Sequence, residues 1–389
     1  MLVKLLKLVG IDKSHMSWDT RKKIYEDIEK HRGCPLIVYC TSKREGINAP
    51  MATDAVPYLI EQLDRIPKDT KEIDFLISSL GGEPMVAWRI MSLLHQRCEK
   101  KVSVLIPQSA YSAATLVAFG AHEIVMHPNG HIGPVDMQIE TTGEGGRKQF
   151  STEDMSAFLD FIRDNLKITD QEHIRTLFEG LSREIGPLNI GFTARSSRLA
   201  GELAERLLGL HMTGDEDKAK IPSIVENMSR KYQSHGWPVN RKEAAGIGLP
   251  INKVQDERLE KLMWDAWLSI EEDLKENSPF YAQYEVLSHK TEGPKLLKPV
   301  KQLDLPMPTG GGQFSSTIKD INDALSEAIN PVDFECKLAL VESARMAHTS
   351  LVKGKILACR TPDMVVQWSV LTTSREWEKQ ENHKENEKK

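Results

Sequence analysis

Residues 74–96 read DFLISSLGGEPMVAWRIMSLLHQ, and residues 101–136 read KVSVLIPQSAYSAATLVAFGAHEIVMHPNGHIGPVD. Asp74–Ser79 and Val102–Ile106 are short apolar runs, each followed by a helical pattern, and Glu123–Met126 is a third such run. Strands that alternate with helices predict an α/β fold with parallel strands and right-handed crossovers. In such sheets the functional site lies in the loops after the carboxyl ends of the strands.

Two of these loops contain the groups that acyl transfer needs. Gly81-Gly82 forms a turn whose N–H groups no Cβ shields, and Ser112 stands at the start of a helix. Acyl transfer uses a nucleophilic hydroxyl together with N–H donors aimed at the oxyanion of the tetrahedral intermediate. Taken singly, the serine also fits a helix N-cap and the glycines fit a tight turn. Their order on successive strand–helix units favours the catalytic interpretation.

Three segments resemble a known superfamily. SSLGG at residues 78–82 resembles the SPGG-type loop of the Clp protease/crotonase superfamily. SAYSAATLVAFGAHEIVMHPNGHIGPVD at residues 109–136 resembles the corresponding segment of signal peptide peptidase A and its relatives. SHGWPVNRKEAAGIGLPI at residues 234–251 is similar to the element that ends this core. The combination is most similar to the serine dehydrogenase proteinase family, over about residues 30–255.

The resemblance implies a Clp/crotonase-like core and a serine peptidase, an endopeptidase that forms an acyl-enzyme. Ser112 would be the nucleophile, and the backbone N–H groups of Gly82 and Ala113 would form the oxyanion hole. Gly81 would bind substrate, an extended peptide or unfolded protein. Relatives of this fold oligomerise, so the resemblance also implies a homo-oligomer.

The general base is the open question at this site. Clp-type enzymes use a histidine after the third strand, where this chain has Val135 and Asp136. Relatives of signal peptide peptidase A use a lysine, which must be neutral to accept a proton. We expect Lys148, in a glycine-rich segment predicted to be a mobile loop, to be this base in a Ser/Lys dyad. Lys167, at a helix end, and His235 remain alternatives.

Two other histidines lie near the third strand. His127 and His131 flank a Pro-Asn-Gly turn, and we expect both side chains to face solvent.

Composition narrows the remaining classes of function. The 389 residues carry a net charge of −5, which argues against a dedicated nucleic-acid-binding protein. The five cysteines are scattered, which favours a reducing compartment without structural disulfides or zinc. No HExxH, Walker A or GxGxxG motif indicates a metal or nucleotide, so we expect no cofactor and, for folded substrates, a separate ATPase or regulatory partner.

The start of the chain bears on localisation. Residues 1–13, MLVKLLKLVGIDK, are too short and too charged to span a membrane and lack a signal cleavage site. We expect a cytoplasmic protein without a transmembrane segment, and peripheral membrane association stays open.

The pattern predicts three regions. Residues 1–295 form the peptidase domain, with helices from 151 to 274 as cover; residues 296–312, rich in proline and glycine, form a linker. Residues 313–389 form a small α+β accessory module with a helix near Thr317–Ile329, three strands and a charged tail that frays into solvent.

Two rival functions follow from the missing histidine and from the shared fold. The first is a catalytically silent scaffold or binding module. The second is a crotonase-type acyl-CoA enzyme, which uses the same oxyanion loop without a serine nucleophile.

Overall fold

The computed structural model describes residues 18–135, 138–143, 146–232, 234–299, 329–361 and 363–381. The chain divides into two compact units. Unit 1 comprises Met1–Thr20, Thr41–Ala49 and Leu268–Lys389, and unit 2 comprises Arg21–Cys40 and Pro50–Trp267. The candidate site lies in unit 2. The predicted boundaries at residues 295 and 312 stay a prediction, because residues 300–328 lie outside the described residues.

The centre of unit 2 is the predicted parallel sheet. Its strands are β1 (Leu36–Thr41), β2 (Glu72–Ser78), β3 (Lys101–Ile106) and β5 (Glu123–Met126), paired in this order. Nearly every residue of these strands is buried, as expected for a parallel sheet covered on both faces. The α/β fold class and the three strands predicted from residues 74–136 are confirmed.

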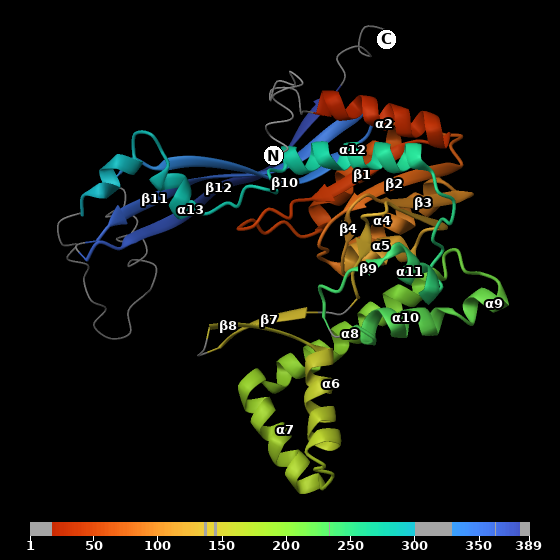
Figure 1. The fold of residues 1–389 in the computed structure, drawn as a ribbon, viewed down its shortest axis with the longest axis horizontal. Helices are drawn as coiled ribbons and strands as arrows, with labels where there is room; N and C mark the ends of the chain where they lie inside the picture. Colours follow the sequence, from red (N-terminus) through yellow and green to blue (C-terminus); the bar gives the residue numbers. More distant parts are fainter. Residues whose placement is uncertain are drawn as a thin grey trace. The chain divides into compact units, whose positions relative to one another are not determined.

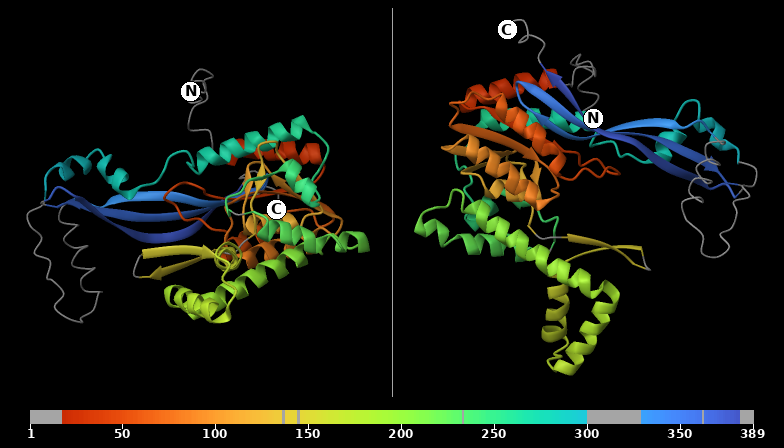
Figure 2. Two further views of the ribbon diagram at one scale, coloured as in Figure 1. Left: turned by 60° about the horizontal axis from the view of Figure 1, so that its bottom comes forward. Right: turned by 180° about the vertical axis from the view of Figure 1, so that it is seen from behind.

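Helices cover both faces of this sheet (Figures 1 and 2). Right-handed crossovers place η2 (Thr53–Ala55) with α3 (Val56–Asp64), α4 (Pro84–Arg97) and α5 (Ala113–Phe119) on one face. The other face carries α2 (Trp18–Arg32) and α12 (Glu257–Asp273). All seven residues of α5 are buried. The helix that follows Ser112 is therefore a fixed part of the core.

A second, three-stranded sheet holds the segment before Ser112. It consists of β4 (Ser109–Ala110), β6 (His131–Ile132) and β9 (Val239–Asn240), with β4 parallel to β6 and β6 antiparallel to β9. β9 leads into α11 (Arg241–Ile247), where a helix is predicted.

The glycine-rich segment predicted as a mobile loop contains an antiparallel hairpin. β7 (Gln138–Gly143) pairs with β8 (Gly146–Ser151), with Gly143 opposite Gly146 at its closed end. The prediction of a mobile loop is wrong, because glycine content does not distinguish the closed end of a hairpin from a loop.

Helices follow this hairpin along most of the remaining unit (Figure 1). They are α6 (Thr152–Asp160), η3 (Phe161–Asn165), α7 (Gln171–Ile185), α8 (Pro187–Leu208), α9 (Asp215–Lys218) and α10 (Ile221–Arg230). The described residues contain no helix that is both long enough and apolar enough to cross a membrane.

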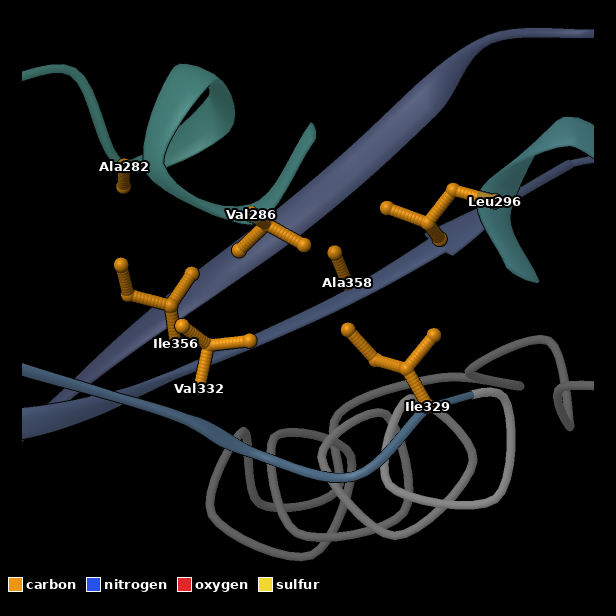
Figure 3. Close-up of a cluster of buried hydrophobic side chains, with 7 residues drawn as sticks. All are labelled: Ala282, Val286, Leu296, Ile329, Val332, Ile356 and Ala358. Atoms are coloured by element: carbon orange, nitrogen blue, oxygen red, sulfur yellow. The ribbon is translucent and has the colours of Figure 1, made fainter. Parts of the chain in front are cut away.

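Unit 1 contains an antiparallel sheet of three long strands. They are β10 (Val332–Glu342), β11 (Met346–Arg360) and β12 (Val366–Glu381), packed against α13 (Ala282–Leu287) and η4 (Gly293–Leu297). Figure 3 shows the buried cluster between them: Ala282, Val286, Leu296, Ile329, Val332, Ile356 and Ala358.

The start of the predicted charged tail belongs to this sheet. β12 continues to Glu381, and Lys353 of β11 forms ion pairs with Glu376 and Glu378 at 2.9 and 2.7 Å. The prediction of a frayed tail is wrong for these residues, because cross-strand pairing accommodates alternating charges along an edge strand. The predicted helix at residues 317–328 lies outside the described residues.

Candidate active site

Ser112 occupies a strained turn between β4 and α5. Its backbone has φ 52° and ψ −116°, and its side chain forms no capping hydrogen bond with the helix. An ordinary N-cap residue has an extended backbone and accepts a bond from the first turn. Holding a serine in this region costs on the order of 1–3 kcal/mol, and such strain concentrates at functional sites. A strained strand–turn–helix also presents the nucleophile of α/β-hydrolases. The geometry argues against the simple N-cap interpretation.

The diglycine loop lies directly against this turn. Gly81 has φ 101°, and a Cβ added there would stand 2.8 Å from Ser112 Cβ and 3.0 Å from Ala113 N. Gly82 has φ 152°, and a Cβ added there would stand 2.3 Å from the carbonyl oxygen of Met51. Both positions require glycine. The structure thus brings together Gly81, Ser112 and Ala113, which the sequence places on successive strand–helix units.

Two backbone donors at this point have no acceptor among the described residues. They are the N–H groups of Gly82 and Ala113, the two predicted for the oxyanion hole. The N–H of Ala113 lacks an intrahelical acceptor because it opens α5. Ala113 is buried and Gly82 is half-buried, so this open pair beside a serine can receive the oxygen of a ligand.

The segment before Ser112 is held on two sides. The Thr115 hydroxyl lies 2.8 Å from the carbonyl oxygens of both Ala110 and Gly133. The ring of Tyr111 packs so closely on Gly133 that a Cβ there would stand 1.8 Å from it. These contacts hold the strained turn in place.

The candidate bases lie in different surroundings. Lys148 pairs with Thr141 in the β7–β8 hairpin, and its side chain lies outside what the structure describes. Lys167 follows η3 with φ 58° and is exposed, and His235 is half-buried. Among the side chains that the structure describes, which do not include that of Lys148, none forms a hydrogen bond with the hydroxyl of Ser112.

The two histidines expected in solvent differ from that expectation. His127 is buried and stacks on Trp264, with ring centroids 4.8 Å apart, and burial lowers the pKa of its imidazole. His131 is half-buried and meets the ring of Tyr111 edge-on at 5.4 Å. Sequence reasoning missed these contacts because Trp264 lies far away in the chain.

Within the described part of the chain, no three His, Cys, Asp or Glu side chains converge as a metal site would require.

Three histidines surround the end of α5. His95 Nε2 donates to the carbonyl of Gly120 at 2.7 Å, and His211 Nε2 donates to that of Phe119 at 3.0 Å. The ring of His122 lies between them, 4.9 Å from His95 and 5.9 Å from His211. Burial lowers the pKa of all three imidazoles, and that of His211 falls to about 4.

Because the pKa values of these histidines are lowered in the folded state, we expect the protein to lose stability in mild acid. Between pH 6.5 and 4 the unfolded chain binds a proton at His211 that the folded chain does not, so stability is retained above pH 6.5 and falls as the pH falls. We expect about 2 kcal/mol from His211 between pH 6.5 and 5. Urea unfolding at both pH values measures it, and His211→Gln should flatten the dependence. An unchanged slope in the variant would contradict the assignment.

Residues 6–145 match the model of the ClpP-like SDH-type serine proteinases. The match confirms the resemblance to the serine dehydrogenase proteinase family over these residues. It includes Gly81, Gly82, Ser112 and Ala113, whereas Lys148 and the other candidate bases lie outside it.

Two curated relatives are uncharacterized proteins of Methanocaldococcus jannaschii. One is 36% identical over 75 residues and the other 35% over 81 residues, which is 19% and 21% of this chain. The aligned parts are 25% and 28% of those proteins, so the chain spans about a quarter of their length. Among solved structures, a mutant of the 1510-N membrane-bound stomatin-specific protease is similar with a TM-score of 0.30 and 16% identity. That match covers 59% of this chain and 85% of the other.

Proposed function

We propose that this protein is a serine endopeptidase, a hydrolase that cleaves peptides or unfolded proteins through an acyl-enzyme on Ser112. The observation that carries the proposal is the strained turn at Ser112, seated against Gly81 and beside two open N–H donors. The ClpP-like match over residues 6–145 supports the same class of enzyme.

The proposed reaction uses these groups in two steps. Ser112 Oγ attacks the carbonyl carbon while the base, Lys148, takes the hydroxyl proton. The N–H groups of Gly82 and Ala113 stabilise the oxyanion, and the C–N bond breaks as the leaving amine receives that proton. A water molecule then attacks the acyl ester while the same base removes its proton. The bond between the acyl carbon and Ser112 Oγ breaks, and Oγ receives that proton. Gly81 would contact the extended substrate.

Mapping of cleavage products tests the proposed function. We expect the full-length protein to cut reduced, carboxymethylated casein, with new amino termini identified by mass spectrometry. The absence of cleavage and of covalent labelling by fluorophosphonates would favour the silent scaffold instead. Thermal stabilisation by acyl-CoA esters, without cleavage, would favour the crotonase-type enzyme.

The identity of the base gives a separate prediction. Because only a general base makes the serine reactive near neutral pH, Lys148→Ala should slow fluorophosphonate labelling by about 100-fold or more, with unchanged unfolding temperature. Lys167→Ala and His235→Ala serve as matched controls and should label at the wild-type rate. If Lys148→Ala labels at the normal rate and one of the two controls labels slowly, the residue replaced in that control is the general base.

We also propose a homo-oligomer, supported by the helices around α7. α7 is amphipathic, yet none of its residues is buried, and a helix of its length is marginal without packing. Phe178, Leu188 and Phe192 expose 43%, 88% and 47% of their surface. A second copy of this chain would cover these side chains.

A single charge tests this contact. Leu188→Asp should lower the oligomeric mass measured by light scattering, because a carboxylate would be buried without a partner. Val254→Asp, at another apolar residue that is 73% exposed, is the matched control and should leave the mass unchanged. An unaltered mass in Leu188→Asp would exclude this surface.

Compartment and partners complete the proposal. All five cysteines are buried without a disulfide, which fits a reducing cytoplasm, and peripheral membrane association remains compatible with the proposal. A separate ATPase or regulatory partner would be needed to unfold stable substrates.

A further inference from the structure

Ser79 contacts both halves of the candidate site. Its backbone N–H donates to the carbonyl of Ser109 and its carbonyl accepts from the N–H of Tyr111, both at 3.0 Å. Its hydroxyl accepts a hydrogen bond from the N–H of Gly81, also at 3.0 Å. The residue is fully buried. One serine is therefore bonded to the segment that carries Ser112 and to the diglycine loop.

The two peptide groups of Gly81 are held by different partners. The N–H of Met51 donates to the carbonyl of Gly81 at 2.7 Å. In a trans peptide the N–H points opposite to the carbonyl, so the N–H of Gly82 points away from Met51. The N–H of Gly81 is directed at Ser79 Oγ. Two neighbouring glycines rotate freely by themselves, so these bonds decide which N–H stays open.

We propose that the Ser79 hydroxyl is a positioning group of the oxyanion hole. It holds the N–H of Gly81 inward, and the N–H of Gly82 remains the donor available to a substrate oxyanion. The inference rests on the proposed function and adds a residue to its machinery. The bond joins two groups of the protein itself, and donors held in place in this way stabilise an oxyanion without rearrangement during the reaction.

Removing the hydroxyl leaves the N–H of Gly81 without an acceptor in a buried site. The diglycine loop is then more stable when this N–H turns toward another acceptor. The peptide between Gly81 and Gly82 thereby loses its orientation. An oxyanion donor acts in the transition state rather than on bound substrate, so its loss lowers kcat more than it changes KM.

The test compares Ser79→Ala with Ser103→Ala in the full-length protein. Ser103 is also a buried serine, whose hydroxyl accepts from Arg32 and donates to Glu123, both at 3.2 Å, at the start of β3. We expect Ser79→Ala to lower kcat about 10- to 100-fold with KM within about threefold. A peptide aldehyde, which forms a tetrahedral adduct with the nucleophile, should bind more weakly by a similar factor. Ser103→Ala should retain the wild-type kcat and aldehyde affinity.

A second variant covers a failure to fold. Ser79→Cys keeps nearly the same volume but offers sulfur, a weak acceptor, and should lower kcat in the same direction by a smaller factor. If the wild-type protein cleaves substrate and the Ser79 variants have the same kcat and aldehyde affinity as Ser103→Ala, this inference alone is overturned. A wild-type protein without cleavage or labelling would overturn the proposed function and the inference together.

Discussion

Substitution of Ser112 by alanine is expected to lower peptide hydrolysis by at least about 10⁴-fold. The proposed acyl-enzyme needs the hydroxyl oxygen, and serine hydrolases retain only the contribution of the oxyanion hole and binding when the nucleophile is removed. Hydrolysis of a fluorogenic peptide by wild type and Ser112→Ala measures the loss. A variant that keeps a tenth of the wild-type rate would exclude Ser112 as the nucleophile.

Ser112→Gly separates strain from chemistry at the same position. Glycine adopts a backbone with φ 52° without the penalty that serine pays, so we expect this variant to be inactive and about 1–2 kcal/mol more stable than wild type. Urea unfolding measures the gain. A loss of about 0.5–1 kcal/mol in Ser112→Gly, the entropic cost of glycine alone, would mean that the turn stores no strain.

Gly81→Ala is expected to damage both activity and stability. The added methyl group would lie 2.7 Å from the carbonyl oxygen of Tyr111 and 2.8 Å from Ser112 Cβ, at a backbone with φ 101°. Displacement of the nucleophile should lower the rate about 100-fold or more, and strain with overpacking should cost about 2–4 kcal/mol.

Gly201→Ala is the matched control for this variant. Gly201 lies within α8, where an added Cβ meets nothing within 4 Å, so alanine should raise stability by up to about 1 kcal/mol and leave the rate unchanged. Wild-type activity in Gly81→Ala would contradict the close approach of the diglycine loop to Ser112.

Local sequence patterns were sufficient to predict the parallel core. β5 has the predicted bounds, and β2 and β3 differ from the prediction by one or two residues. Buried parallel strands are continuous apolar runs bounded by turns, and this signal is local. The β7–β8 hairpin was missed because its pairing depends on register, which glycine content does not indicate.

At the candidate site too, features set by neighbouring residues were predictable, and contacts between distant segments were not. Ser112 and the glycine pair stand out because each follows a strand directly. The bonds of Ser79 and Met51 could not be predicted, because they join segments that only the fold brings together. The burial of His127 against Trp264 was missed for the same reason.

The site of fluorophosphonate modification in the wild-type protein tests most directly whether Ser112 is the nucleophile. Trypsin should release residues 102–147 as one peptide, which contains three serines: Ser103, Ser109 and Ser112. Tandem mass spectrometry then identifies the modified residue. We expect a single adduct on Ser112. No adduct under native conditions, or an adduct on a different serine, would contradict it.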